Sequence, residues 1–182
     1  THIALSVVGF HNIYNALASA AVGDRLGLSA QEISAGLGSF VGLRRRFEYK
    51  GCVNGAEIYI DYAHHPRELS ATLAGAKKMT GGRLICFFEP HTYSRTASLF
   101  DEFASAFSDA DMTYFLDIYA AREVNTSGVT SEKLALATPN GHYAKSYEEA
   151  ADIIREAARE GDTVMILGAG TVDKIADILF GC

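Results

Sequence analysis

The chain of 182 residues has few cations, few cysteines and no long apolar run. It has 16 Lys and Arg against 22 Asp and Glu, a formal net charge of −6. Nucleic-acid binding depends largely on clustered cations, so this balance disfavours a nucleic-acid partner. No apolar stretch approaches the length needed to span a bilayer, and no signal-peptide pattern opens the chain. We therefore expect neither a nucleic-acid nor a membrane partner.

The cysteines Cys52, Cys86 and Cys182 are odd in number, widely spaced and outside any Cys-x-x-Cys motif. This favours reduced thiols in a cytoplasmic protein over a disulfide framework. A phosphate-binding loop of the Gly-x-x-x-x-Gly-Lys-Ser/Thr type is also missing from the sequence. What the chain does have is 48% hydrophobic and 21% charged residues, which is typical of a globular protein with a core. It begins with Thr inside a strand-like run, residues 3–8, so we interpret it as a fragment of a longer protein.

Hydrophobic periodicity predicts helices at residues 12–26 and 30–37, followed by a loop and a domain boundary at residues 38–46. Ser29 and Glu32 form a capping-box pattern for the second helix. From residue 47 onward strands and helices alternate, which favours a Rossmann-like, mostly parallel α/β sheet with flanking helices. Asn54 and Gly55 indicate a hairpin, so the first two strands are expected to be antiparallel. The expected strands are 47–50, 56–60, 83–88, 112–118, 143–145 and 163–167, and the expected helices are 66–79, 94–107, 131–137, 147–160 and 172–179.

Two polar segments follow strand-like runs and lead into helices: Asp-Tyr-Ala-His-His-Pro at residues 61–66 and Glu-Pro-His-Thr-Tyr-Ser-Arg-Thr at residues 89–96. In an open parallel sheet, turns at the carboxyl ends of strands border the ligand crevice. We therefore expect the histidines of both segments and Arg95 to share one polar pocket. His91 and Arg95 are four residues apart, so they would lie on one side of a helical turn and could bind a small carboxylate.

Each of these side chains also has an ordinary structural interpretation. Asp61 either accepts hydrogen bonds from a ribose or orients a histidine, or it only caps the turn after its strand. The histidines bind a carboxylate, move a proton or ligate a metal, or one of them is merely structural. Adjacent histidines usually point apart and no metal-ligand spacing is present, which disfavours a zinc site built from Asp61, His64, His65 and His91.

The arginines have surface alternatives. Arg95 pairs with Asp101 or Glu102 if it is only a surface residue. The Arg-Arg-Arg run at residues 44–46 either clamps a phosphate or is a solvated linker.

Two more segments are compatible with nucleotide binding. His11, Asn12 and Asn15 cluster in one turn and suit the edge of a purine, although Asn12 could serve only as a helix cap. Gly-Ala-Gly at residues 168–170 resembles the start of a dinucleotide motif without its third glycine, and tight strand-to-helix packing explains it adequately.

Together these motifs resemble the Mur ligase family. The matching segments lie at residues 9–17, 42–48, 61–66, 90–96, 118–123 and 168–170, and they span nearly the whole chain. The resemblance implies a ligase of three domains. Residues 1–46 would be the end of the central ATP-binding domain and its linker, and residues 47–182 the C-terminal amino-acid-binding domain. The N-terminal domain and the rest of the central domain would belong to the same longer protein.

The resemblance also implies the reaction and the nucleotide contacts. It implies a cytoplasmic enzyme of peptidoglycan precursor synthesis that joins L-alanine to UDP-N-acetylmuramate through an acyl phosphate, using ATP and Mg²⁺. Asp61 would hold the ribose and Arg46 would reach toward the phosphates. Adenine would be contacted by His11, Asn12 and Asn15. Alone, the chain would be inactive, because it has no phosphate loop.

The L-alanine pocket would be lined by Tyr62, His64, His65, His91 and Arg95. Arg95 would bind the carboxylate, and His64 and His91 would be candidates for positioning rather than assigned catalytic groups. No residue is assigned to a metal.

Three departures from the family pattern bear on this pocket. Glu89, Thr92 and Arg122 stand where many members have Gln, Arg and Gly, which leaves Arg95 as the main carboxylate receptor.

Three other functions are alternatives to this ligase. They are the murein-peptide recycling ligase of the same family, a non-catalytic module that binds a nucleotide or an amino acid, and a metalloenzyme that uses the histidines.

Overall fold

The structure, a computed structural model, describes residues 2–7 and 10–181, and for residues 10 and 11 the backbone alone. The chain divides into two compact units, Thr1–Arg44 and Arg45–Cys182. The first unit contains α1 (Phe10–Arg25) and α2 (Ala30–Gly38), and Ser29 and Glu32 form the predicted capping box of α2. Two predictions are wrong. Asn12 lies inside α1 rather than at its cap, and residues 3–7 are not a strand, because the described part of this unit offers no strand with which they could pair.

The two helices of the first unit bury little of their apolar surface within it. None of the described residues of α2 is buried. On α1 and just after it, Tyr14, Leu17 and Leu26 are 70%, 61% and 76% exposed. Two short helices cannot build a core by themselves. These side chains are therefore suited to packing against protein outside the unit.

The second unit is built on one six-stranded sheet of order β1-β2-β6-β3-β4-β5. Its strands are β1 (Glu48–Val53), β2 (Ala56–Asp61), β3 (Leu84–Phe88), β4 (Met112–Phe115), β5 (Gly141–Tyr143) and β6 (Thr163–Leu167). β1 and β2 are antiparallel, and the other neighbouring strands are parallel. Asn54 and Gly55 join β1 to β2 with φ angles of +52° and +82°, as a tight hairpin turn requires. The hairpin and the mostly parallel α/β class are confirmed.

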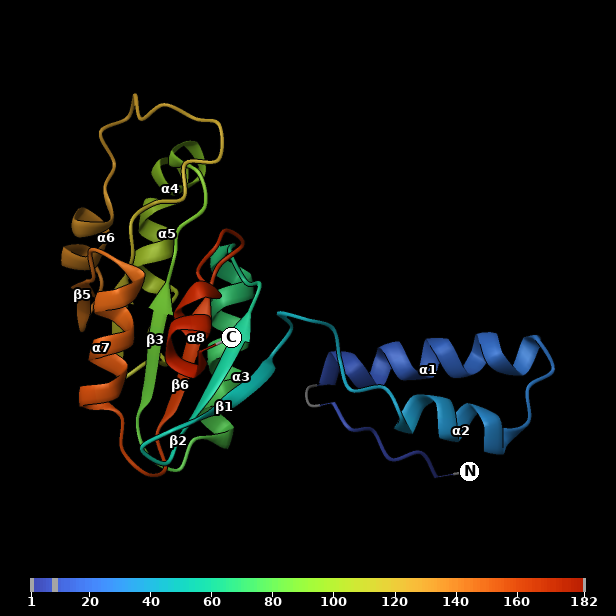
Figure 1. Cartoon of the computed structure of the whole chain (residues 1–182). Helices are drawn as coiled ribbons and strands as arrows, with labels where there is room; N and C mark the ends of the chain where they lie inside the picture. The colour runs from blue at the N-terminus through green and yellow to red at the C-terminus, as the bar shows by residue number, and fades with distance from the viewer. Residues whose placement is uncertain (1, 8–9, 182) are drawn as a thin grey trace. The chain divides into compact units, whose positions relative to one another are not determined.

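Helices cover both faces of this sheet (Figure 1). They are α3 (Pro66–Met79), α4 (Tyr93–Ser98), α5 (Phe100–Ser105), α6 (Ser131–Ala137), α7 (Tyr147–Ala157) and α8 (Lys174–Phe180). One core cluster joins the sheet to α3, α5 and α6 through Leu73, Phe103 and Leu134. The other joins it to α7 and α8 through Ile154 and Ile175. Residues 84–88 of β3 and 164–167 of β6 alternate between the two clusters, which explains why both segments are apolar throughout.

Several element ends differ from the expected ones. The helix expected over residues 94–107 is two short helices separated at Leu99, whose φ of −116° is not helical. β4 ends at Phe115, and the chain continues to an isolated parallel bridge between His91 and Tyr119. β5 begins two residues early, α7 ends three residues early and α8 begins two residues late. Within the described ranges, no helix is both long and apolar enough to cross a membrane.

Candidate functional site

The carboxyl ends of β2, β6 and β3 lie side by side and border the candidate site. The Gly168 N–H donates to the Asp61 carbonyl at 3.2 Å, and the Glu89 N–H donates to the Leu167 carbonyl at 3.0 Å. β6 is the last strand in the sequence, but it lies between β2 and β3 in the sheet. This edge is therefore the topological switch point at which open α/β sheets bind ligands.

Asp61 ends β2 with both carboxylate oxygens engaged. Oδ1 accepts from the Ala63 N–H and Oδ2 from the Phe47 N–H, each at 2.8 Å. Burial raises the pKa of Asp61, and these two hydrogen bonds oppose the rise. The carboxylate thus caps the turn after β2 and also binds the backbone of Phe47, the residue just before β1. Its assignment to a ribose stays a prediction.

His65 and its neighbour His64 have different hydrogen-bond partners. The His65 Nδ1 accepts from the Arg67 N–H at 3.4 Å and caps α3, and the Glu68 carboxylate accepts from the His65 N–H at 3.2 Å. The His64 Nδ1 lies 3.0 Å from the Tyr62 carbonyl. A carbonyl only accepts, so Nδ1 of His64 carries the proton and, in the neutral ring, Nε2 is an acceptor. A substrate contact by His65 stays a prediction.

Four rings gather at this edge of the sheet. The Tyr62 and His64 rings are 5.4 Å apart, the His64 and His91 rings 6.1 Å, and the His91 and Tyr119 rings 5.4 Å, measured between centroids. The segments that contain His64 and His91 are thus brought together. Sequence reasoning missed Tyr119 as a member of this cluster.

His91 and Arg95 carry buried polar atoms without a partner. Nδ1 of His91 and one terminal nitrogen of Arg95 (NH1) are buried and make no hydrogen bond. Burial lowers the pKa of His91, and the neighbouring Arg95 guanidinium and His64 side chain lower it further, while the Glu123 carboxylate opposes them. The ring is therefore neutral at pH 7. Among the described residues, no ion pair joins Arg95 to an acidic side chain. An unpaired guanidinium beside a neutral imidazole suits a small carboxylate ligand.

The turn after β6 packs too tightly for a side chain. A Cβ added to Gly170 would lie 2.2 Å from Oε1 of Glu89 and 2.7 Å from Cγ of Tyr119. On the linker, the Arg45 guanidinium donates to the carbonyls of Gly168 and Gly170 at 2.6 and 2.9 Å. These contacts favour the packing interpretation of the Gly-Ala-Gly segment over a dinucleotide motif.

Glu89, which stands where many family members have Gln, is buried beside the turn at residues 168–170. The Tyr147 hydroxyl donates to its carboxylate and lies 2.9 Å from the Thr171 hydroxyl. Burial raises the pKa of Glu89, and donation by Tyr147 opposes the rise. Sequence reasoning missed Tyr147, because its contact with Glu89 spans 58 residues and leaves no local signal.

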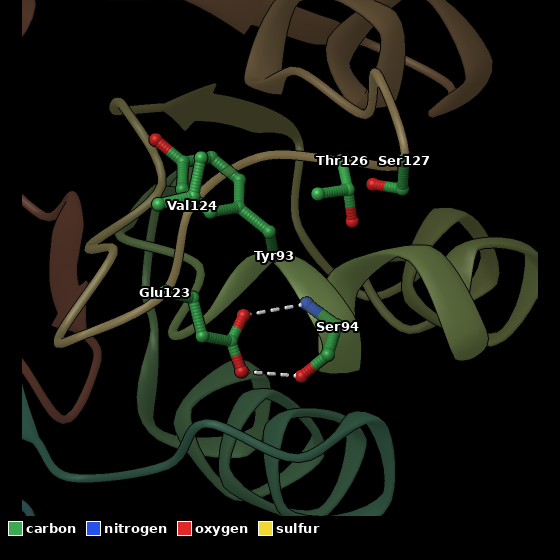
Figure 2. Close-up of a pocket in the computed structure, with 6 residues that line it drawn as sticks. All are labelled: Tyr93, Ser94, Glu123, Val124, Thr126 and Ser127. Atoms are coloured by element: carbon green, nitrogen blue, oxygen red, sulfur yellow. Dashed lines mark hydrogen bonds between the residues drawn. The ribbon is translucent and has the colours of Figure 1, made fainter.

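A cavity of about 240 Å³ lies beside α4 (Figure 2). It is lined by Tyr93, Ser94, Glu123, Val124, Thr126 and Ser127. The Glu123 carboxylate accepts from the Ser94 N–H at 2.8 Å and from the Ser94 hydroxyl at 2.5 Å. These bonds hold the pKa of Glu123 below its ordinary value. Glu123 therefore anchors the start of the helix that carries Arg95.

The residues expected to contact a nucleotide are divided between the two units. In the first unit, Asn12 and Asn15 lie on α1, with the Asn15 amide 3.4 Å from the Asn12 side-chain oxygen. The side chain of His11 lies outside the described residues. In the second unit, the guanidinium carbons of Arg45 and Arg46 lie 5.1 and 5.6 Å from the centre of the Tyr62 ring. Within the described ranges, no group of three His, Cys, Asp or Glu side chains is arranged to hold a metal ion.

One protein family matches most of the second unit. The family described as Mur ligase, glutamate ligase domain, matches residues 45–170. The chain belongs to the Mur ligase family.

Curated members of the Mur ligase family are similar over nearly the whole chain. The UDP-N-acetylmuramate–L-alanine ligase of Caldicellulosiruptor bescii is 43% identical over 182 residues, which cover 98% of this chain and 40% of that protein. The Agathobacter rectalis protein of the same name is 46% identical over 181 residues, covering 97% of this chain and 39% of that protein. The chain thus spans about two fifths of the length of these relatives.

Solved structures of the family share the fold. The UDP-N-acetylmuramate-alanine ligase from Thermotoga maritima has a TM-score of 0.79 at 25% identity, covering 98% of this chain and 39% of that one. A murein peptide ligase from Psychrobacter arcticus has a TM-score of 0.66 at 28% identity, covering 98% of this chain and 38% of that one.

Proposed function

We propose that this chain is the C-terminal part of an ATP- and Mg²⁺-dependent ligase that joins L-alanine to UDP-N-acetylmuramate in peptidoglycan precursor synthesis. In this proposal the first unit completes the central ATP-binding domain, and the second unit binds the amino acid. The names of the curated relatives described above support the substrates. The observation that carries the proposal is the buried, unpaired terminal nitrogen of Arg95 beside His91.

Arg95 would bind the carboxylate of L-alanine, because a guanidinium pairs with a carboxylate through two parallel hydrogen bonds. The neutral His91 ring adds no second positive charge, and Nε2 of His64 remains free to accept from the amine. The domain would thus orient the amine for attack on the activated muramoyl carboxylate. Orientation of this kind is a large part of the rate enhancement in a reaction of two bound substrates.

The nucleotide contacts follow from the same proposal. ATP supplies the phosphoryl group that activates the muramoyl carboxylate. Arg46 would reach its phosphates, and Asp61 would accept from the ribose, since each carboxylate oxygen has a second lone pair beyond its backbone bond. Adenine would lie against His11, Asn12 and Asn15 of the first unit. The described residues contain no set of three metal ligands, so Mg²⁺ would be held by the phosphates and by the rest of the protein.

The test is Arg95→Gln in the full-length ligase. Loss of a buried charge-assisted pair costs about 3 kcal/mol, so the KM for L-alanine should rise by about 100-fold while the KM for ATP stays unchanged. The matched control is Arg67→Gln, which alters an exposed arginine on α3 and should change neither constant. An equal rise in both KM values would contradict a carboxylate contact.

The substrates offered in this assay also decide between the alternatives. A ligase that accepts a murein tripeptide in place of L-alanine would be the recycling enzyme. A full-length protein that binds ATP and L-alanine but forms no peptide bond would be a binding module.

A further inference from the structure

Tyr119 contacts His91 through both its backbone and its ring. The two residues form an isolated parallel β-bridge, in which the Tyr119 N–H donates to the Pro90 carbonyl at 2.8 Å and the Thr92 N–H donates to the Tyr119 carbonyl at 2.9 Å. Their rings stack at 5.4 Å with an angle of 26° between the planes. Backbone and side chain of Tyr119 therefore both engage the same histidine.

Hydrogen bonds to Nδ1 do not fix the orientation of the His91 ring. That atom is buried and has no partner in the described structure. Histidine has a broad preference at its second side-chain torsion, so a ring without such a bond is held by what packs against it. The Tyr119 face supplies this support on one side, and the His64 ring lies 6.1 Å away.

The Tyr119 ring also packs closely against Gly170. The Cβ that Gly170 lacks would lie 2.7 Å from Cγ and 2.9 Å from Cδ2 of the Tyr119 ring. Only glycine at position 170 lets the ring occupy this place. The position of Gly170 is held in turn by the Arg45 guanidinium, which donates to its carbonyl at 2.9 Å.

We propose that Tyr119 is a positioning residue that sets the orientation of the His91 ring at the amino-acid site, with Gly170 and Arg45 holding Tyr119 in place. The link from His91 to the amino acid rests on the proposed function, whereas the link from Tyr119 to His91 rests on geometry alone. Two readouts, one of which needs no ligase activity, therefore separate the two claims.

The first readout is the titration of His91 by NMR in the chain of 182 residues, with the His91 signals assigned from their loss in His91→Asn. Tyr119→Phe keeps the stacked ring and should leave the titration unchanged. Tyr119→Leu removes the stack and exposes His91, so the pKa of His91 should rise toward its ordinary value. The other charged or titratable groups that act on His91, namely Arg95, His64 and Glu123, are the same in every variant.

A second tyrosine–histidine stack provides the matched control. Tyr114 of β4 lies on His142 of β5 with centroids 5.1 Å apart and planes at 28°. Tyr114→Leu should alter the signals of His142 and leave those of His91 as they are. If Tyr119→Leu does not give a folded spectrum, Tyr119→Val takes its place with the same expected results, because a β-branched residue suits an extended segment.

The second readout is steady-state kinetics of the full-length ligase. Misplacing a binding group by about 1 Å can cost as much as about 100-fold, so Tyr119→Leu should raise the KM for L-alanine by about 10-fold without changing that for ATP, and Tyr119→Phe should match the parent. A His91 titration that is the same in the Leu, Phe and parent proteins would overturn the proposal. A shifted titration with an unchanged KM for L-alanine would uphold the positioning of His91 and remove His91 from the amino-acid site.

Discussion

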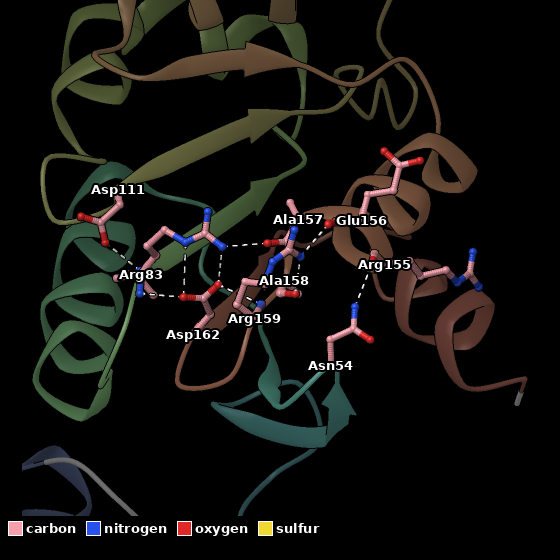
Figure 3. Close-up of polar contacts among 10 residues, drawn as sticks. Asn54, Arg83, Asp111, Arg155, Glu156, Ala157, Ala158, Arg159 and Asp162 are labelled. Atoms are coloured by element: carbon pink, nitrogen blue, oxygen red, sulfur yellow. Dashed lines mark hydrogen bonds and ion pairs between the residues drawn. The ribbon is translucent and has the colours of Figure 1, made fainter.

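Asp162 lies just before β6, at the end of the sheet away from the candidate site, where it joins elements that are far apart in the sequence (Figure 3). Its side chain, only 4% exposed, accepts from the Arg83 guanidinium at 2.6 Å and from the backbone N–H groups of Arg83 and Arg159 at 2.9 and 3.1 Å. The same guanidinium donates to the Ala157 carbonyl at 2.7 Å. One carboxylate thus ties β3 and β6 to the end of α7, and Asp162→Ala removes the acceptor for Arg83 and Arg159 while the Ala157 carbonyl remains.

The size of the effect follows from the donors left behind. A buried donor without an acceptor costs about 1–3 kcal/mol. The Arg83 side chain is 42% exposed, so water replaces much of what its guanidinium loses. The two backbone N–H groups, whose hydrogen bonds to Asp162 are part-buried, remain as the main cost. We therefore expect the free energy of unfolding to fall by about 3 kcal/mol, which lowers the midpoint of thermal unfolding by about 6–12 °C in a chain of this length.

Urea and thermal unfolding followed by circular dichroism measure this loss. The matched control is Asp152→Ala, which removes an aspartate–arginine contact from the exposed side of α7, where Arg155 donates to Asp152 at 2.8 Å. Exposed ion pairs contribute about 0.2–1 kcal/mol, so the control should change little. Equal losses in the two variants would refute the argument from buried donors.

The charge of Asp162 also predicts a pH dependence. Burial raises the pKa of Asp162, but the bonds from Arg83 and Arg159 outweigh it, so the pKa lies below its ordinary value. A carboxyl with a lower pKa in the folded state stabilises the protein above its unfolded pKa of about 4, and this contribution is lost as the pH falls through the folded value. Asp162→Asn should therefore be less stable than the parent at pH 7, by a margin that shrinks below about pH 4. A margin that does not change with pH would show that the charge contributes nothing.

Two further substitutions test packing and capping by urea unfolding. Gly170→Ala should destabilise the protein by about 1–3 kcal/mol, because the added Cβ would lie 2.2 Å from Oε1 of Glu89. Gly75→Ala is its control, because Gly75 lies in the middle of α3 and the added Cβ would have no atom within 4 Å apart from its chain neighbours and the backbone of its own helix. It should stabilise by about 0.5–1 kcal/mol, and effects of the same sign would contradict the packing argument. His65→Ala should cost about 0.5–2 kcal/mol through loss of the α3 cap, and His65→Asn should recover most of it. An Asn variant as unstable as the Ala variant would mean that His65 does not stabilise the protein as a cap.

Local patterns were sufficient to predict the fold class and the meeting of the two polar segments. The bounds of α3, α6 and β6 are those expected from periodicity, capping residues and apolar runs. The nearness of the His64 and His91 rings was predictable because the carboxyl ends of parallel strands share one edge of the sheet. The two predictions that failed in the first unit were local as well: a strand over residues 3–8, of which the structure describes 3–7, and a cap at Asn12. A strand pattern cannot form a strand when the described unit supplies no partner.

Only the tertiary structure decided which side chains support the site. The Arg45 guanidinium reaches the Gly170 carbonyl across 125 residues, and the Tyr147 hydroxyl reaches Glu89 across 58. Tyr119 lies against His91 because β3 and β4 are parallel neighbours and their chains continue side by side beyond the sheet. No local stretch of sequence predicts these contacts, because each depends on the order in which the strands pair. The residue types and spacings determined which polar groups are available at the candidate site, and the strand order determined how those groups are held.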